Sequence, residues 1–324
     1  MNDSNEPHEL HHVIAAQKRG DDLILVYLSY WEDDAANAVG QIVRTTFFDR
    51  QGSYESILNT NDVLTPTLWC SPTNNLWVGS ANGNVWTTAH VAWPPHRMAG
   101  LVYDVRDATL SWTVTTLPDL KQLGHKPNVS ALWGIGDANV FIGTFTGGIY
   151  HWNGTEWLQV FEAVGEPINH IHGSAENDVY AVGNKGTILH FDGTAWRQLP
   201  YPGDGVNRDV LTGVRALNQN EAFVCGTAGR ILHGSRSGFE ILGQFAIPFY
   251  GITYFQNRLI LASGMKGAHE LRGNQVSVLR DIFGAVAIFE MMDRVFFIEP
   301  TQEPASIIDY CPILDPPWAR RRYP

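Results

Sequence analysis

Two histidines one residue apart, His170 and His172, have the residue type and spacing of a metal site. Residues i and i+2 of a strand point to one face of the sheet, and imidazole is a common zinc ligand. A third ligand has no identifiable place in the sequence, so we expect both side chains to pack or to take part in hydrogen bonds. The sequence has no phosphate-binding loop, dinucleotide fingerprint, nucleophile elbow, EF-hand or zinc motif. We therefore predict a protein without catalytic residues, metal or cofactor.

A second set of side chains recurs at one position of short apolar segments. The residues just before them in sequence are expected to pack between neighbouring repeats, so these side chains should face the opposite way. The candidate binding site comprises Trp69, Trp133, His172, Arg215 and Thr253. Tryptophan and arginine dominate protein-binding hot spots, and they also suit sugar stacking. The set predicts a surface for a protein partner, with a glycan or small-molecule ligand, or two tryptophans that merely fill a wall, as the alternatives.

These residues need a repeating framework, and the sequence contains one. Residues 148–157 and 187–196 each read as an apolar strand, an Asn-Gly or Asp-Gly turn and a second strand that begins with Trp157 or Trp196. Gly154 and Gly193 can adopt the positive φ that such hairpin turns require. A repeat of about 40 residues built from short strands is typical of a propeller blade.

A polar turn followed by an apolar strand occurs seven times, beginning near residues 21, 74, 138, 177, 220, 257 and 293. The sequence therefore predicts an all-β fold, a single seven-bladed β-propeller of four-stranded antiparallel blades over residues 1–324. The long spacing of the first two units leaves six or eight blades as alternatives. The expected blades are 8–60, 64–120, 129–166, 167–207, 208–247, 248–284 and 285–310. Residues 311–324, with four prolines and Arg320, Arg321 and Arg322, are expected to form a tail outside the blades.

Three further segments carry structural predictions. An acidic hairpin tip in the first blade, Glu32-Asp33-Asp34, is a candidate loop for a cation or a basic partner, or a solvated loop. Residues 100–103 and 110–114 should form an extra strand pair within the second unit. A strand at residues 10–15 should pair with the last blade to close the ring, because an open ring would leave an exposed edge.

The hairpins Ile-Tyr-His-Trp-Asn-Gly-Thr-Glu-Trp157 and Ile-Leu-His-Phe-Asp-Gly-Thr-Ala-Trp196 resemble repeats of bacterial propellers of the sialidase-type (BNR) and photosystem II assembly-factor-like kind. The resemblance covers residues 129–247 and implies seven blades, a binding scaffold and structural roles for the two tryptophans and turn glycines. It does not imply hydrolysis. Trp152 and Phe191 replace the aspartate of the sialidase Asp-box, and no arginine triad with a Tyr–Glu pair is present. His151, His190 and His233 recur in register, which favours a structural role such as a hydrogen bond between blades.

Composition narrows the function further. The formal net charge of −11 disfavours nucleic acid and anionic membranes as partners, and it favours a basic protein. Three widely spaced cysteines fit a reducing compartment. No leader-like segment and no apolar run of membrane-spanning length is seen, so we expect a cytoplasmic bacterial protein without membrane insertion.

The function that we predict is that of a non-enzymatic protein-binding scaffold. Its sharpest form is an immunity or inhibitor protein that caps a basic toxin or effector. One alternative is a carbohydrate-binding or glycoside-cleaving propeller, for which Glu290 is the carboxylate nearest the candidate site. Another is an assembly factor for a membrane protein complex.

Overall fold

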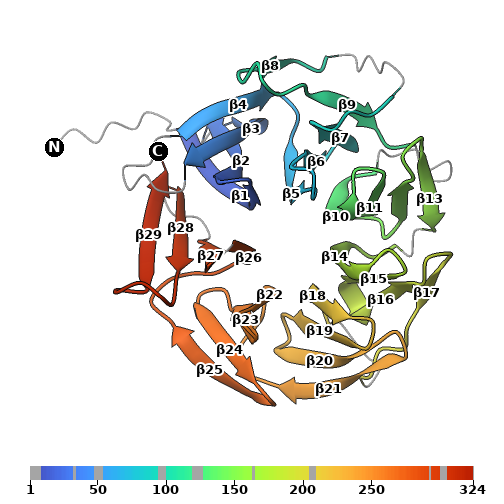
Figure 1. Cartoon of the computed structure of the whole chain (residues 1–324), viewed down its shortest axis with the longest axis vertical. Helices are drawn as coiled ribbons and strands as arrows, with labels where there is room; N and C mark the ends of the chain where they lie inside the picture. The colour runs from blue at the N-terminus through green and yellow to red at the C-terminus, as the bar shows by residue number, and fades with distance from the viewer. Residues whose placement is uncertain are drawn as a thin grey trace.

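The computed structural model describes residues 9–31, 34–46, 54–93, 100–118, 127–162, 165–203, 209–291, 293–299 and 305–323. They form seven antiparallel sheets that surround a central axis as the blades of a propeller (Figure 1). A single turn of 3-10 helix at Asn184–Gly186 is the helical element of this described part. It is far too short to cross a membrane, and none of the described residues form a helix that could do so. The prediction of an all-β, seven-bladed propeller is confirmed.

Each blade begins at the channel and proceeds outward in the order of its strands. Blade 1 contains β1 (Glu9–Arg19), β2 (Asp22–Trp31), β3 (Asp34–Thr46), β4 (Tyr54–Thr60) and β8 (Tyr103–Val105). Blade 2 contains β5 (Leu64–Cys70), β6 (Leu76–Ser80), β7 (Asn84–Thr87) and β9 (Thr113–Thr116). Blade 3 contains β10 (Val129–Gly136), β11 (Asn139–Thr144), β12 (Ile149–Trp152) and β13 (Trp157–Phe161).

The remaining four blades are built from contiguous runs of chain. Blade 4 contains β14 (Ile168–Ala175), β15 (Asp178–Gly183), β16 (Ile188–Phe191) and β17 (Trp196–Gln198), and blade 5 contains β18 (Leu211–Asn218), β19 (Glu221–Gly226), β20 (Arg230–Ser235) and β21 (Gly238–Gln244). Blade 6 contains β22 (Gly251–Phe255), β23 (Arg258–Ala262), β24 (Ala268–Arg272) and β25 (Gln275–Arg280). Blade 7 contains β26 (Ala287–Met291), β27 (Arg294–Ile298), β28 (Ala305–Tyr310) and β29 (Trp318–Tyr323).

The insertion of the second unit spans two blades. β8 pairs with β4 at the outer edge of blade 1, whereas β9 pairs with β7 and completes blade 2. The prediction that these two segments pair with each other is therefore wrong. The exchange covers the outer edge of blade 1, and it places the ring of Tyr103 edge-on against Trp86 of blade 2, with centroids 5.2 Å apart.

Ring closure also differs from the prediction. β1 is the innermost strand of blade 1, and blade 7 is built wholly from residues 287–323. Closure by an N-terminal strand is wrong because the C-terminal segment supplies the fourth strand of blade 7. Its prolines 312, 316 and 317 precede β29 and leave that strand's ladder intact. Blades 1 and 7 meet through buried apolar side chains, among them Val13, Leu25, Phe296, Ile298 and Ile307.

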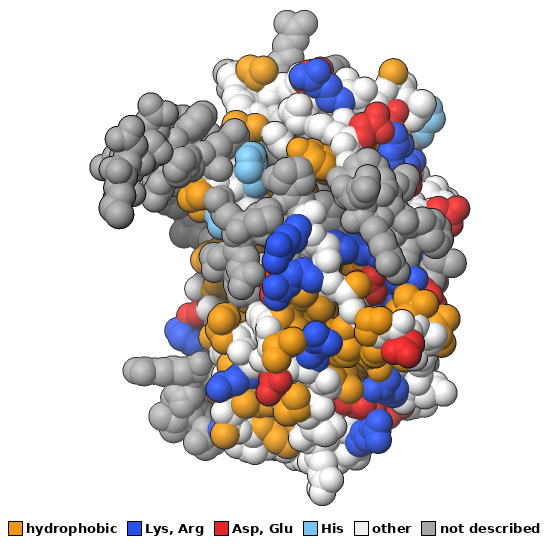
Figure 2. Space-filling model, turned by 90° about the vertical axis from the view of Figure 1, so that its left-hand side faces the viewer, with side chains coloured by type: hydrophobic (Ala, Val, Ile, Leu, Met, Phe, Trp, Pro, Cys, Tyr) orange, Lys and Arg blue, Asp and Glu red, His pale blue; other side chains and the backbone are white. Residues whose placement is uncertain are grey.

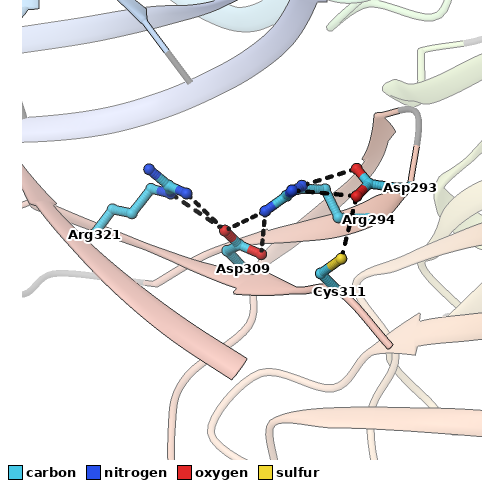
Figure 3. A network of polar contacts seen from close by, with 5 residues as sticks. All are labelled: Asp293, Arg294, Asp309, Cys311 and Arg321. Carbon is cyan, nitrogen blue, oxygen red and sulfur yellow. Dashed lines mark hydrogen bonds and ion pairs between the residues drawn. The ribbon is translucent and has the colours of Figure 1, made fainter. Parts of the chain in front are cut away.

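A buried polar network fastens β29 to its blade (Figure 3). Asp309 of β28 accepts hydrogen bonds from Arg294 of β27 at 3.2 Å and from Arg321 of β29 at 2.9 Å. Asp293 contacts the other side of Arg294 at 3.0 Å and accepts a hydrogen bond from the Cys311 thiol at 3.3 Å. The predicted free tail is thus a blade strand held by ion pairs, and Arg321 belongs to the interior of the blade.

The two repeated hairpins have the turn chemistry that the sequence suggests. Gly154 and Gly193 have φ values of 90° and 95°, which favour glycine. The side-chain oxygen of Asn153 accepts the backbone N–H groups of Thr155 and Glu156, and Asp192 does the same in the next blade. Trp157 and Trp196 follow these turns and are each 8% exposed, so their rings belong to the core of the outer strands.

The recurring histidines bind within their blades, not between blades as expected. The imidazole Nε2 of His151 lies 2.7 Å from Asn139 Oδ1, and that of His190 lies 3.0 Å from Asp178 Oδ1. In blade 5, His233 lies 3.5 Å from the carboxylate of Glu221. Each imidazole also packs against an aromatic ring of the second strand, namely Phe141, Tyr180 or Phe223.

Opposite charges occupy the same two register positions in three other blades. The pairs are Asp22–Arg44 in blade 1, Arg258–Glu270 in blade 6 and Arg294–Asp309 in blade 7. In every case the first residue opens the second strand, and its partner lies on the third strand opposite the residue two positions on. We call these six pairs the polar rung. It links the second and third strands of blades 1 and 3–7 at one end of the propeller.

Candidate functional site

A cavity of about 480 Å³ lies at the centre of the ring and is lined by the innermost strands of all seven blades. The five side chains of the candidate site, from Trp69 to Thr253, all line it. They come from β5, β10, β14, β18 and β22, which are consecutive around the channel in Figure 1. Their common cavity follows from the shared register of these strands.

The six-membered rings of the two tryptophans lie against glycines in the inner strand of the next blade. A Cβ atom on Gly134 would come within 2.7 Å of the Trp69 ring, and one on Gly173 would come equally close to the Trp133 ring. Glycine is therefore required beneath each indole. Trp69 is 9% exposed, whereas Trp133 is half-buried, and its ring lies 5.7 Å from that of His172. Both residues help to form the wall, and Trp133 also presents surface to the cavity.

His170 and His172 connect blades 4 and 5. Nδ1 of His170 accepts the backbone N–H of Val214 at 3.4 Å, and Nδ1 of His172 accepts that of Ala216 at 3.3 Å. Burial, and to a lesser extent the nearby charge of Arg215, lowers the pKa of both imidazoles, and that of His170 falls to about 4. Both rings are neutral near pH 7 and carry their proton on Nε2. They act as hydrogen-bond acceptors toward the backbone, and no group of three His, Cys, Asp or Glu side chains among the described residues could hold a metal ion.

The carboxylate of Glu290 joins blades 5, 6 and 7. From the sequence, this residue had a role only in the alternative of a glycoside-cleaving propeller. Glu290 of β26 accepts a hydrogen bond from Nη2 of Arg215 at 2.5 Å and one from the Thr253 hydroxyl at 3.1 Å. The Nε atom of Arg215 is buried and has no hydrogen-bond partner. The side chains of Arg215 and Glu290 remain 23% and 34% exposed, so a ligand in the channel could contact both.

Exposure divides the candidate residues into two groups. Trp69 and Thr253 are too buried to offer a partner much surface. Trp133, His172 and the Arg215–Glu290 pair keep accessible surface on the cavity. Among the described residues that line it, Glu290 is the single carboxylate, whereas glycoside hydrolysis by the common mechanisms uses two. The arrangement can stack on an apolar group and bind polar groups of either charge.

The structure does not describe the side chains of the acidic tip Glu32-Asp33-Asp34. Glu32 and Asp33 lie outside the described residues, and so does the side chain of Asp34, whose backbone opens β3. Trp31, which precedes the tip, ends β2, and Asp34, the last residue of the tip, begins β3.

The sequence and the fold were compared with known proteins. No protein-family model matches the sequence. A segment of 112 residues, 34% of this chain, is 28% identical to the immune protein Tsi7 of Pseudomonas aeruginosa and covers 33% of that protein. The chain thus spans about a third of this relative.

Solved structures are similar over most of the chain. The WD40 propeller domain of Doa1 has a TM-score of 0.56 at 12% identity, over 97% of this chain and 93% of that one. YCF48 bound to a D1 peptide has a TM-score of 0.55 at 12% identity, over 80% and 81%. At such identities the likeness concerns the fold alone, and it agrees with the seven sheets described above: the chain is a seven-bladed β-propeller.

Proposed function

We propose that this chain is a non-enzymatic, cytoplasmic propeller that binds another protein, as an immunity protein that caps a basic toxin or effector domain. The observation that carries the proposal is the 28% identity to a protein named an immune protein, over a third of the chain. A propeller of the same fold has been solved with a bound peptide, which shows that such a ring can hold a polypeptide.

The charge of the chain supports a basic partner. The formal net charge is −11, and summed charge of one sign steers association with partners of the opposite sign. We therefore expect a partner with an isoelectric point well above neutrality and an association rate that falls as salt is added.

We place the contact at the mouth of the central cavity, with Trp133, His172 and Arg215 as the residues that touch the partner. Trp69 and Thr253 support them from within the wall. Glu290 adds a carboxylate that can accept a lysine or arginine side chain of the partner, while Arg215 keeps that carboxylate in place. The tip Glu32-Asp33-Asp34 is proposed as a second acidic contact.

We further propose that the repeats belong to the BNR-like type in a non-catalytic form. The support is the paired Asn-Gly and Asp-Gly turns with their following tryptophans, together with the lack of the Asp-box aspartate at Trp152 and Phe191. This origin favours a scaffold that kept the blade hairpins and lost the hydrolase site.

The test begins with affinity capture of the tagged chain from its native cells, followed by expression of the captured protein alone and together with this chain. The proposal expects a basic protein that arrests growth alone and becomes harmless with this chain. The double variant Arg215→Gln, Glu290→Gln should weaken binding at least about tenfold, since the loss of even one charge-assisted contact costs about 1.5–3 kcal/mol.

The matched control is Arg230→Gln with Asp209→Asn. This ion pair has the same 2.5 Å separation, and its arginine is 21% exposed against 23% for Arg215, but it lies outside the cavity lining. If both double variants weakened partner binding equally, the central cavity would be refuted as the binding site, but the proposed role as an immunity protein would still stand. A captured partner without toxicity would refute the immunity role, and turnover of a glycoside would refute the non-enzymatic proposal.

A further inference from the structure

A second groove lies on the outer rim of the ring, between the end of β25 and β29. Its volume is about 380 Å³, and its lining shares no residue with the central cavity. The lining comprises Arg280, Ile282, Phe283, Ile308, Trp318, Ala319, Arg320 and Arg322. Figure 2 views the molecule from the side of these outer strands and shows Lys and Arg side chains set among hydrophobic ones. The groove is basic on a chain whose net charge is −11.

The three arginines face one groove because of the strand period. Trp318, Arg320 and Arg322 alternate along β29 and share a face, whereas Arg321 points the other way, to Asp309. The guanidinium of Arg280 lies 5.4 Å from the centre of the Trp318 ring, close enough for a cation–π contact. The opposite wall thus adds a cation to the two on β29.

Two of these arginines are held in place by the protein. Trp318 supports Arg280, and Nη2 of Arg320 lies 3.0 Å from the buried carboxylate of Glu299. Arg322 is exposed and makes no ion pair with any residue that the structure describes. Within the part of the chain that the structure describes, most donor groups of the three guanidinium ions have no partner and are free for an anionic ligand.

The floor of the groove is apolar. Phe283 and Ile308 are 6% and 4% exposed, and Ile282 stands at the rim with 69% of its surface exposed. Charges on an edge strand also discourage aggregation, but the outer strands β17 and β25 have one arginine each, and β13 and β21 have no Lys or Arg. Protection of an edge does not explain three arginines around an apolar floor.

We propose that this groove binds an extended acidic peptide segment of another protein, with carboxylates on the arginines and an apolar side chain on the floor. Arginine pairs with carboxylates through parallel hydrogen bonds. Because the floor of the groove is apolar, it favours a ligand that also has an uncharged, apolar side chain. A nucleic acid fits poorly, since three cations cannot offset the repulsion between a polyanion and a chain of charge −11. The inference stands independently of the proposed immunity role.

The experiment titrates the full chain with a fluorescein-labelled peptide of alternating Glu and Leu, followed by fluorescence anisotropy. Versions with Gln or Lys in place of Glu test the charge. The double variant Arg280→Gln, Arg322→Gln should weaken binding of the Glu peptide at least about tenfold. Arg320 is left intact because its removal would leave the buried carboxylate of Glu299 without its ion-pair partner. Ile282→Ser, at an exposed position, should weaken it several-fold.

The matched control is Arg106→Gln with Arg236→Gln, which removes the same charge from two exposed arginines that do not line the groove. It should bind the Glu peptide as the unaltered chain does. The proposal is overturned if the Glu peptide does not bind, if the Gln peptide binds equally well, or if the control loses as much affinity as the groove variant. Tighter attachment to phosphatidylserine vesicles than to the peptide, lost in the groove variant, would also overturn it in favour of a lipid surface.

Discussion

Of the six pairs in the polar rung, His190–Asp178 is the most deeply buried, and removal of its histidine should destabilise the protein strongly. In blade 4 the side chains of His190 and Asp178 are 1% and 0% exposed. Burial raises the pKa of Asp178, but hydrogen bonds from His190 and Ser174 outweigh it and hold the pKa below its usual value. His190→Leu leaves this carboxylate buried with Ser174 as its main donor. Breaking a buried pair by removing one partner costs about 3–5 kcal/mol.

Two other blades supply matched comparisons. His151→Leu in blade 3 removes a bond to the neutral amide of Asn139, which should cost about 1 kcal/mol. In blade 5, His233 and Glu221 are 35% and 42% exposed and lie 3.5 Å apart, so His233→Leu should cost about 0–1 kcal/mol. Leucine keeps an apolar contact with the neighbouring aromatic ring in all three.

The assay is urea unfolding at neutral pH, followed by tryptophan fluorescence, with the free energy of unfolding obtained by linear extrapolation. The expected order of loss is His190→Leu, then His151→Leu, then His233→Leu. Equal losses in the three variants, or the largest loss in blade 5, would refute the reasoning that burial of the carboxylate sets the cost.

Three further predictions concern other contacts. The pKa of His170 is about 4 in the folded chain and about 6.5 when unfolded, so the unfolded chain binds the proton first and stability falls as the pH drops from 6.5 to 4. His170→Gln, whose amide oxygen can accept the Val214 N–H, should flatten the urea midpoint plotted against pH, and an unchanged slope would contradict this. Asp62 is 2% exposed and accepts the indole N–H of Trp86, so Asp62→Ala should lower the free energy of unfolding by about 3 kcal/mol in urea titrations, and a loss below about 1 kcal/mol would contradict it. Asp309→Ala should loosen β29 and speed trypsin cleavage at its arginines, with undiminished resistance as the contrary result.

The local parts of the fold could be predicted from the sequence. The Asn-Gly and Asp-Gly turns require a positive φ, and the alternation that follows them defines a strand, so each blade hairpin is encoded within a few residues. The pairing of distant strands is not encoded in this way. Residues 103–105 and 113–116 both have strand character, yet each joined a different blade edge. Residues 318–323 were not predicted to form a blade strand because the segment is rich in proline, yet Pro312, Pro316 and Pro317 all lie before that strand.

The candidate site shows the same division. The shared register of the inner strands indicated that Trp69 and Trp133 line one cavity. It could not indicate that glycines of the next blade lie beneath their rings, or that Glu290 of blade 7 reaches Arg215 of blade 5. Such contacts depend on how the ring brings the inner strands together around the channel.

The junction of blades 1 and 7 has a mechanical consequence. No described strand is shared across it, and the first and last described strands, β1 and β29, belong to the two blades that it separates (Figure 1). At this junction the ring is closed by the packing of apolar side chains of blade 1 against those of blade 7. Opening this junction breaks no backbone ladder, so the circumference can adjust without unfolding a blade. Duplication or loss of a contiguous segment next to it can change the blade number, which offers a route by which rings of different size arise from one repeat.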